Sequence, residues 1–256
     1  MKKKLKVLVT AGDTYEPVDE VRRLTHMATG RLGSLIADAF AQQGACVTFL
    51  CGERSLRPSR EMETTVTITG VMELQSAMQE LLADTTFDAV IHSMAVSDYT
   101  VRGLAAEEDV SAEIAKSVLS AGQETDESKL QDIIFQALQR AAYTPNGKIS
   151  SDLPSLLVFL DRAPKVIPLV KQMQPNAILV GFKLLAGVSE QELLDAVSAQ
   201  MQSSGSDFVL ANDLSGIVGD THGAMLVGRD GILDRPGTKQ EIAASIVRHV
   251  TQRAAG

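Results

Sequence analysis

The stretch that decides the fold reads LKVLVTAGD at residues 5–13 and continues, after a polar loop, as GRLGSLIADAFAQQ at residues 30–43. Its first part is a short apolar run rich in β-branched residues, which is typical of a buried strand. The second part carries apolar residues such as Ile36 and Phe40 at helical spacing, which predicts a helix with one apolar face. The two parts together predict the beginning of a βα unit.

The same alternation continues along the chain. Strands are predicted at residues 5–10, 45–50, 64–69, 88–92, 177–182 and 207–211, and helices at 30–43, 71–83, 164–174 and 189–204. The strand segments are nearly continuous apolar runs, so both faces of the sheet should be covered by helices. The predicted fold class is therefore α/β, with a Rossmann-like, doubly wound, mostly parallel sheet.

Residues 101–147 interrupt this rhythm, because they are rich in Ala, Glu, Asp and Ser and contain no convincing strand. An amphipathic helix is predicted at 127–142. We interpret about 101–150 as an inserted flap or dimerisation segment, since long insertions in compact domains are often binding or assembly elements. The apolar face of the predicted helix needs a cover, which favours a homodimer.

The carboxyl-terminal part has a different pattern. AMLVG and ILDR flank Arg229-Asp230-Gly231, which predicts a β-hairpin with a glycine-containing turn, followed by a helix from residue 238. The hairpin and helix together occupy about residues 222–254. We expect residues 1–256 to form a single α/β domain that carries the insertion.

Charge and composition narrow the possible functions. The chain of 256 residues has 24 Lys and Arg against 32 Asp and Glu, a formal net charge of −8. Such a charge repels nucleic acid and anionic lipid, so neither is an expected partner. No apolar run approaches the ~18 residues of a membrane helix, and the start of the chain does not resemble a signal peptide. These features predict a cytoplasmic protein.

The loop after the first strand and the start of the first predicted helix form the first candidate site. Gly12, Asp13 and Thr14 follow the strand, and Gly30 and Gly33 open the helix. Glycines at a helix start let backbone N–H groups approach an anion, although close packing explains such a pair equally well. Because Gly12 is far from Gly30 in the chain, the compact dinucleotide fingerprint is missing and NAD binding is disfavoured.

Other strands also end in polar residues. In a doubly wound sheet, ligands bind beyond the carboxyl ends of the strands, so these residues are candidates for one shared site. Asp98 is compatible with Mg²⁺ or a ribose hydroxyl, or with a loop cap. Lys148, at the end of the insertion, is compatible with a loop that carries its charge onto phosphates, or with a solvated surface lysine. The remaining candidates at strand ends are Ser93, Met94, Ala95, Phe182, Lys183 and Asn212.

Metal and hydrolase motifs are missing from the sequence. His26, His92, His222 and His249 show no metal-ligand spacing, and the sequence has no Cys-x-x-Cys pair. It also lacks the Gly-x-Ser-x-Gly nucleophile elbow. A structural zinc site and a serine hydrolase are therefore disfavoured.

Five blocks resemble the phosphopantothenate–cysteine ligase family in the right order. They are VLVTAGDTYEPVDEVRRLT…TGRLG (7–33), IHSMAVSDYT (91–100), GKISSDLPSLLVFLDRAPKVI (147–167), LVGFKLL (179–185) and DFVLANDLSG (207–216). The chain is most similar to the stand-alone bacterial form, which works with a separate flavin-dependent decarboxylase. The resemblance implies that CTP or ATP, with Mg²⁺, activates the carboxylate of 4′-phosphopantothenate as an acyl-nucleotidylate. The amine of L-cysteine then displaces the nucleoside monophosphate.

The resemblance also implies roles for individual residues. The implied nucleotide site comprises Gly12, Asp13, Thr14, Ser93, Met94, Ala95, Asp98, Lys148, Pro164, Lys165, Val166, Ile167, Phe182, Lys183 and Asn212. Asp98 is assigned to the ribose or metal region. Thr29, Gly30 and Arg31 are assigned to phosphopantothenate, with Arg31 as a phosphate ligand.

The chain departs from the family pattern at two places. His26 stands where the family has an Asn that binds the activated acyl group, and an imidazole N–H can donate one hydrogen bond as an amide does. We therefore assign His26, with Lys148, to catalysis, and a surface-loop role remains the alternative for His26. The segment 189–204 lacks the lysines that face the phosphates in relatives, a role for which Lys183 or Lys165 can substitute.

Two other hypotheses are compatible with the same sequence. A catalytically weakened paralogue would bind nucleotide or a pantothenate derivative as a sensor or assembly protein. An NAD(P)-dependent reductase on the same fold is disfavoured by the missing fingerprint.

Overall fold

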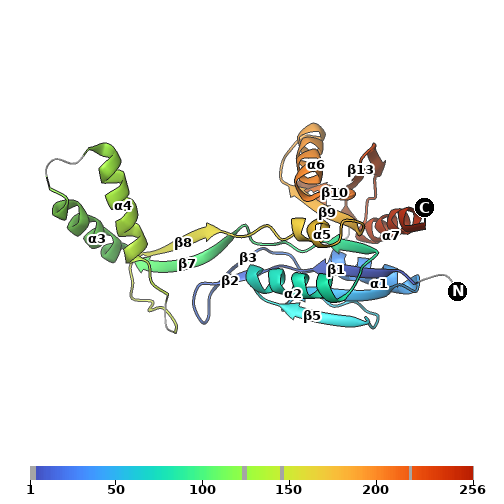
Figure 1. Cartoon of the computed structure of the whole chain (residues 1–256), viewed down its shortest axis with the longest axis horizontal. Helices are drawn as coiled ribbons and strands as arrows, with labels where there is room; N and C mark the ends of the chain where they lie inside the picture. The colour runs from blue at the N-terminus through green and yellow to red at the C-terminus, as the bar shows by residue number, and fades with distance from the viewer. Residues whose placement is uncertain (1–3, 123–125, 145–146, 219–220, 256) are drawn as a thin grey trace. The chain divides into compact units, whose positions relative to one another are not determined.

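The chain forms two compact units in a computed structural model that describes residues 4–122, 126–144, 147–218 and 221–255 (Figure 1). Unit 1 comprises residues 1–14, 26–96 and 164–256, and unit 2 comprises residues 15–25 and 97–163. The predicted insertion lies within unit 2, together with residues 15–25.

Unit 1 is built on an eight-stranded sheet in the order β14-β13-β10-β9-β6-β1-β4-β5. Its strands are β1 (Lys6–Ala11), β4 (Cys46–Gly52), β5 (Thr64–Ile68), β6 (Ala89–His92), β9 (Ile178–Leu185), β10 (Phe208–Asp213), β13 (Met225–Gly228) and β14 (Gly231–Asp234). The first six are parallel to one another, and β13 and β14 form the antiparallel hairpin predicted near the end of the chain. The predicted fold class and all six predicted strands are confirmed.

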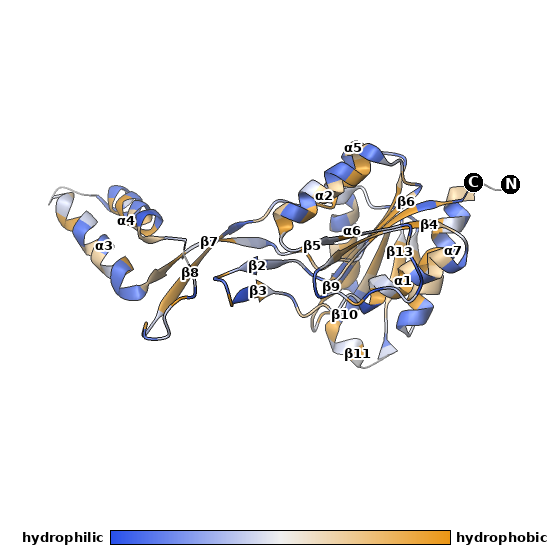
Figure 2. Cartoon of the chain, turned by 90° about the horizontal axis from the view of Figure 1, so that it is seen from below, coloured by the Kyte–Doolittle hydropathy of each residue, from blue (hydrophilic) through white to orange (hydrophobic). Residues whose placement is uncertain are grey.

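Helices cover both faces of this sheet. α1 (Arg31–Gln42) and α7 (Lys239–Ala255) pack on one face, while α2 (Val71–Asp84), α5 (Pro168–Met173) and α6 (Glu190–Ser204) pack on the other. Successive residues of β1 point to opposite faces, so Val7 and Val9 join the core under α1 and Leu8 joins the core under α2. This two-sided burial explains why the strand segments are continuous apolar runs, which Figure 2 shows in orange in β4 and β6.

The predicted helix at 164–174 is wrong at its amino end, because α5 begins only at Pro168. Proline fits the first position of a helix, where its missing N–H costs nothing. Farther inside a helix its ring would clash with the carbonyl four residues earlier, so the helix cannot extend back to Pro164. Residues 164–167 instead form an irregular connection.

Unit 2 contains β2 (Tyr15–Pro17) paired with β3 (Arg23–Thr25), and β7 (Tyr99–Ala106) paired antiparallel with β8 (Leu156–Arg162). Two helices, α3 (Glu107–Ser120) and α4 (Glu127–Ala141), connect β7 to the rest of the insertion. α4 confirms the helix predicted at 127–142. Val18, Leu104 and Ile149 form a small core of their own.

The prediction that 101–147 contains no strand is wrong, because β7 covers residues 99–106. Its sequence YTVRGLAA has small residues where a strand pattern needs large ones, so the segment does not look like a strand by itself. Its order depends on residues far along the chain: Leu104 exchanges two backbone hydrogen bonds of 2.8 Å with Tyr143. Gly103 packs closely there, since a Cβ would lie 3.1 Å from the Tyr143 carbonyl oxygen.

Two short pieces complete the described chain. A 3₁₀ turn at Leu214–Gly216 follows β10, and β11 (Ile217–Val218) pairs with β12 (Thr221–His222). Within the described residues, none of the helices has the length and apolar character needed to cross a membrane.

Candidate functional site

The carboxyl edge of the sheet in unit 1 is built around glycines. Gly12 follows β1 and Gly30 precedes α1, and both have positive φ angles, 82° and 75°. A Cβ atom on Gly30 would lie 1.9 Å from Ser55 Oγ and 3.0 Å from the Gly12 backbone nitrogen. Both the backbone conformation and the space therefore require glycine at Gly30.

Two further glycines complete this arrangement. A Cβ on Gly33 would lie 2.5 Å from the Ala11 side chain, and one on Gly52 would lie 2.3 Å from the Asp13 carbonyl oxygen. We call Gly12, Gly30, Gly33 and Gly52 the glycine-packed edge. The packing explanation of the Gly30–Gly33 pair is thus confirmed, and it brings the start of α1 directly against the end of β1.

The start of α1 has the character of an anion site. Gly30 caps the helix in the left-handed conformation and no acidic residue lies in its first turn; the side-chain contact to its first N–H group is a long one, from Arg31 N to Thr29 Oγ1 at 3.4 Å. Backbone N–H groups in a first turn carry partial positive charge, which favours a bound phosphate or carboxylate. The Arg31 side chain at this position is exposed. Packing and anion binding are therefore compatible uses of the same glycines.

The two loops predicted to hold the nucleotide lie side by side. Ala95 N donates to Gly12 O at 2.9 Å, and Thr14 N donates to Ala95 O at 3.1 Å. Ser93 Oγ donates to the Thr10 carbonyl oxygen at 2.6 Å. The structure thus brings residues 12–14 and 93–95 together, as the sequence predicted for a shared site.

A buried histidine contacts the hydroxyl group that connects these two loops. His92, the last residue of β6, has its Nδ1 3.0 Å from Thr10 Oγ1, and Met94 N donates to the same hydroxyl at 3.3 Å. Burial lowers the pKa of His92 to about 4, so the ring is neutral near pH 7. This role was not predicted from the sequence, where His92 was weighed only as a metal ligand; the available signal was that Thr10 and His92 are polar residues at the ends of two apolar strands.

The neighbouring strands β9 and β10 carry the remaining candidates of unit 1. Phe182 and Lys183 are partly exposed near the end of β9, Asn212 is buried near the end of β10, and Val166 is buried. Because β10, β9, β6 and β1 are adjacent in the sheet, their carboxyl ends form one row. Phe182, Lys183 and Asn212 lie in that row, separated from β1 by β6, whereas Val166 lies in the irregular connection before α5.

Asp213 joins the ends of these two strands, a role that sequence analysis missed. Its carboxylate accepts hydrogen bonds from Ser215 and from the backbone N–H groups of Gly187 (3.2 Å) and Val188 (3.0 Å). The Ser215 side chain and N–H, followed by Val188 and Gly187, hold the pKa of Asp213 far below its usual range. Asp213 therefore stays ionised and connects the loop after β9 to the end of β10.

The loop that carries the implied substrate residues is exposed. His26, Thr29 and Arg31 all have exposed side chains, and Leu56 N donates to the Thr29 carbonyl oxygen at 2.9 Å. This contact brings residues 53–57, which sequence analysis did not consider, to the start of α1. Arg57 of that loop contacts Cys51 Sγ and donates to Thr67 Oγ1 at 3.0 Å.

Asp98 and Lys148 belong to unit 2, and both side chains are exposed. The carbonyl oxygen of Asp98 accepts a hydrogen bond from Ala163 N at 2.9 Å. The structure places both residues within unit 2 only, so their assignment to the nucleotide remains a prediction.

A buried carboxylate holds the segment that carries Lys148. The Asp19 side chain is out of contact with solvent and accepts hydrogen bonds from Val21 N (2.9 Å), Arg22 N (2.7 Å) and Ile149 N (3.1 Å). Desolvation raises the pKa of Asp19, but the N–H groups of Val21, Ile149 and Arg22 outweigh it and hold the pKa below its usual value. We call Asp19 and these contacts the Asp19 anchor, which sequence analysis missed.

Among the described residues, no three His, Cys, Asp or Glu side chains gather into a metal-binding group. Magnesium that accompanies a nucleotide typically needs only one or two carboxylates, since phosphate oxygens and water supply the other ligands. The exposed carboxylate of Asp98 fits that requirement.

An open α/β sheet with a glycine-packed carboxyl edge and a glycine at the start of its first helix is typical of the doubly wound class, whose members commonly bind phosphates or nucleotides at this edge. The family can be stated more closely. The profile of the DNA/pantothenate metabolism flavoprotein C-terminal domain matches residues 2–126 and 125–254, and the chain belongs to this family. The predicted family resemblance is confirmed.

Individual relatives agree with this assignment. The coenzyme A biosynthesis bifunctional protein CoaBC of Thermococcus kodakarensis is 33% identical over 93% of this chain and 49% of its own length. The chain therefore spans about half the length of this relative. The crystal structure of the DNA/pantothenate metabolism flavoprotein from Streptococcus pneumoniae matches with a TM-score of 0.79 and 32% identity, covering 97% of this chain and 99% of that one.

A more distant structure shares the fold. The solved structure of a Cab2 mutant in complex with phosphopantothenate-cysteine has a TM-score of 0.67 at 18% identity and covers 98% of this chain and 86% of its own.

Proposed function

We propose that this chain is a ligase that forms an amide between 4′-phosphopantothenate and L-cysteine, a step of coenzyme A biosynthesis. The single observation that carries the proposal is the glycine-packed edge, where residues 12–14 and 93–95 lie against the start of α1. Family membership supports it, as do the named relatives, which include a coenzyme A biosynthesis protein and a protein bound to phosphopantothenate-cysteine.

The proposed reaction has two steps. A carboxylate oxygen of phosphopantothenate attacks the α-phosphorus of CTP or ATP, and pyrophosphate leaves. The amine of cysteine then attacks the activated carbonyl carbon, loses a proton, and expels the nucleoside monophosphate. Both steps bring anions together, so holding the reactants and offsetting their charge matter more than a protein nucleophile.

Residues of unit 1 have proposed binding roles. Residues 12–14 and 93–95 contact the nucleotide through backbone groups, and Thr29, Gly30 and Arg31 receive the phosphate of phosphopantothenate. Residues 164–167, Phe182, Lys183 and Asn212 line the nucleotide site. His92 holds the 93–95 loop through Thr10 and acts as a positioning residue, because it is buried beneath that loop.

Asp98, Lys148 and His26 have roles that rest on the family resemblance. Lys148 offsets charge on the triphosphate, and Asp98 would hold the Mg²⁺ that accompanies the nucleotide. The bound metal would shield the phosphate oxygens from the incoming carboxylate. His26 donates its N–H to the acyl oxygen during cysteine transfer.

A pyrophosphate-release assay tests the proposal. Phosphopantothenate with each of the four nucleoside triphosphates should give pyrophosphate, and added cysteine should then give nucleoside monophosphate. The assay also decides between CTP and ATP. If no triphosphate yields pyrophosphate while one still raises the melting temperature, the chain is the nucleotide-binding sensor and the ligase proposal is wrong.

The role of His26 separates the two half-reactions. His26→Ala should slow cysteine-dependent monophosphate release by ~10²-fold, the scale of one lost oxyanion donor, and affect pyrophosphate release much less. His26→Asn, which restores the family residue, should be active. If Ala leaves both half-reactions unchanged, His26 is only a surface-loop residue.

We also propose that the chain is a homodimer, works with a separate flavin-dependent decarboxylase, and is cytoplasmic. Exposed apolar side chains on the insertion, Leu119 on α3 and Phe135 on α4, support the dimer. Light scattering at micromolar concentration checks it, and a particle of 27.4 kDa, with and without nucleotide, would exclude it.

A further inference from the structure

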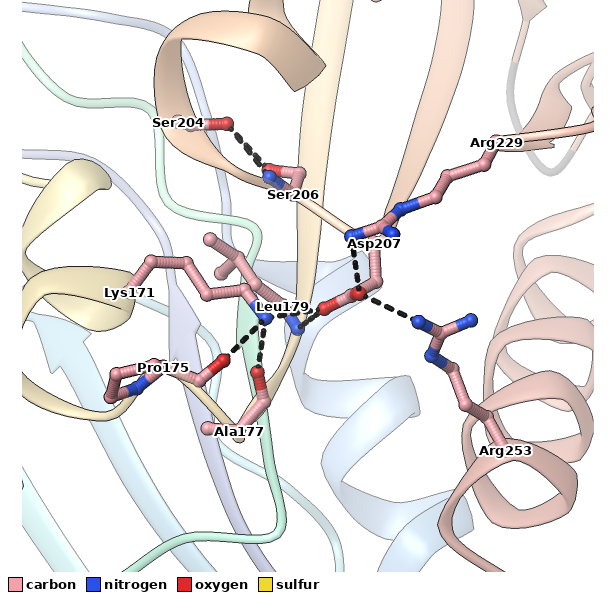
Figure 3. Close-up of polar contacts among 9 residues, drawn as sticks. All are labelled: Lys171, Pro175, Ala177, Leu179, Ser204, Ser206, Asp207, Arg229 and Arg253. Atoms are coloured by element: carbon pink, nitrogen blue, oxygen red, sulfur yellow. Dashed lines mark hydrogen bonds and ion pairs between the residues drawn. The ribbon is translucent and has the colours of Figure 1, made fainter. Parts of the chain in front are cut away.

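The opposite, amino edge of the same sheet carries a cluster of charges around one buried carboxylate (Figure 3). Asp207 immediately precedes β10 and is only 4% exposed. Its Oδ2 accepts hydrogen bonds from Lys171 Nζ at 2.7 Å and from Leu179 N at 3.0 Å. Lys171 also donates to the Ala177 carbonyl oxygen at 2.7 Å. Asp207 Oδ2 and Lys171 therefore connect α5, β9 and β10 through hydrogen bonds.

The other oxygen of Asp207 is shared by two arginines. Arg253 Nη2 lies 3.0 Å from Oδ1 and Arg229 Nη2 lies 3.7 Å from it. Each guanidinium has five N–H donors, so one carboxylate oxygen can accept from only a few of the ten donors of the two arginines. The arginine side chains are 44% and 71% exposed. Two guanidinium groups, one from the β13–β14 turn and one from the end of α7, thus meet at Asp207 and retain N–H donors that this carboxylate does not use.

These arginines line a cavity of about 420 Å³, with Asp207, Phe208, His249 and Gln252 among the other lining residues. Among the described lining residues, Asp230 is the other carboxylate, so two arginines face two carboxylates; Lys171 lies outside the lining and pairs with Asp207 Oδ2. The Arg253 guanidinium lies 5.7 Å from the centre of the Phe208 ring. His249 Nε2 is buried and has no hydrogen-bond partner within the described part of the chain. The cavity therefore combines two guanidinium groups, each with N–H donors that Asp207 does not use, with an aromatic wall.

We propose that this cavity binds the phosphate group of a small phosphorylated organic molecule. The planar forks of two arginines fit a phosphate well, because its several oxygens can accept from both at once. The cavity is in the size range of small-molecule sites and exceeds the space that a bare phosphate fills, so the ligand has an organic part beside Phe208. This proposal goes beyond the ligase function and does not depend on it.

The proposed phosphate site is separate from the glycine-packed edge. β10 begins beside Asp207 and ends at Asp213, so its six residues put roughly 20 Å between the two edges. Both edges belong to unit 1. A phosphorylated ligand can therefore occupy the amino edge while nucleotide occupies the carboxyl edge.

Histidine side-chain NMR can test the site directly, because the chain has four histidines and only His249 lines this cavity. The probe is phenyl phosphate, titrated into the full-length protein at low salt, with the His249 resonance assigned from a His249→Gln variant. The resonance should shift saturably. Inorganic phosphate should bind more weakly than phenyl phosphate, and benzoate more weakly still, if phosphate and an aromatic wall are both recognised.

Two arginine variants separate a ligand site from a purely structural ion cluster. Arg229→Gln, at the exposed and longer contact, should weaken binding at least tenfold and leave the melting temperature nearly unchanged; Arg253→Gln should weaken it similarly. Arg235→Gln is the matched control, because Arg235 is an exposed arginine paired with Glu190 outside the cavity. An unshifted His249 resonance in the wild type, or equal affinity in Arg229→Gln and wild type, would overturn the proposal.

Discussion

The glycine-packed edge of unit 1 and the Asp19 anchor of unit 2 hold candidate site residues in two different ways. At the edge, an added Cβ would meet backbone at Gly52 and both the Ser55 side chain and the Gly12 backbone at Gly30, so neither position has room for a side chain. At the anchor, one carboxylate collects several N–H groups, including that of Ile149 next to Lys148. Close backbone packing tolerates almost no substitution, whereas the hydrogen bonds of a carboxylate can be removed one at a time.

This difference predicts how the two regions respond to mutation. A change at the edge displaces backbone and should affect stability and ligand binding together. A change at the anchor should loosen one segment and leave the remainder of the fold in place. The following four predictions test the comparison, beginning with the largest effect.

Gly30→Ala should have the largest effect. Positive φ alone costs an L-residue ~1–2 kcal/mol, and the new Cβ must also displace Ser55 or Gly12. We expect a loss of at least ~2 kcal/mol of unfolding free energy in urea, since strain and overpacking add. Pyrophosphate release should fall more than ~10²-fold, because misplacing the start of α1 removes an oriented anion site.

The chain offers a matched control for Gly30. Gly44 also has a positive φ, 82°, but a Cβ there would meet nothing within 4 Å. Gly44→Ala should therefore lose only the ~1–2 kcal/mol of backbone strain and keep its activity. Equal losses in the two variants would mean that close packing at the edge contributes nothing.

Lys148→Gln should have the next largest effect, and on activity alone. An exposed side chain contributes little to folding, so stability should change by less than ~0.5 kcal/mol. Pyrophosphate release should slow by ~10²-fold if the charge acts on the triphosphate. Lys129→Gln, an exposed lysine on α4, is the control and should behave like the wild type. A normal rate in the Lys148 variant would remove this residue from the site.

The two regions also differ in how far sequence could predict them. The glycine-packed edge was predictable in outline, because Gly12, Gly30 and Gly33 stand at the ends of strongly patterned elements. The β-branched runs of unit 1 likewise predicted its strands, since both faces of the sheet are buried.

Unit 2 was much less predictable because its order comes from distant partners. Asp19 is one of many acidic residues in the sequence, and its contact with Ile149 joins positions 130 residues apart. β7 similarly requires β8, whose paired residues lie 50 to 63 positions later, before its small residues form a strand. No local periodicity encodes such pairings. The Asp207 cluster was missed for the same reason, since its cations come from three separate elements.

A third prediction concerns the pH dependence of stability at the edge. The pKa of buried His92 is about 4 in the folded protein, below an unfolded value of ~6.5. As the pH falls from 6.5 towards 4, the unfolded chain therefore takes up a proton that the folded protein does not, and stability falls. By pH 4.5 this loss should reach about 2–3 kcal/mol.

Urea unfolding at pH 7 and pH 4.5 measures this loss as the difference between wild type and His92→Asn. The Asn variant lacks the titrating ring, so its stability should fall by about 2–3 kcal/mol less between the two pH values. If His92→Asn has the same pH dependence as the wild type, His92 is not held neutral by burial.

The smallest effect is expected from Asp19→Asn, which tests the anchor itself. Asparagine keeps one oxygen for Val21 N and Arg22 N but replaces the oxygen that accepts from Ile149 N with an NH₂ donor. We expect faster hydrogen exchange at the Ile149 amide and a roughly tenfold slower pyrophosphate release, because Lys148 is then less well held.

A double variant makes the interpretation specific. If Asp19 acts only by positioning Lys148, adding Asp19→Asn to Lys148→Gln should slow the reaction no further. If the two residues act independently, the fold-losses of the two single variants should multiply. Asp152→Asn is the control, because this exposed carboxylate bonds Ser150 in the same segment without holding Ile149. Faster Ile149 exchange with an unchanged rate would show that the anchor orders the segment for a purpose other than Lys148. If the rate of the double variant falls by the product of the two single fold-losses, Asp19 affects the reaction independently of Lys148.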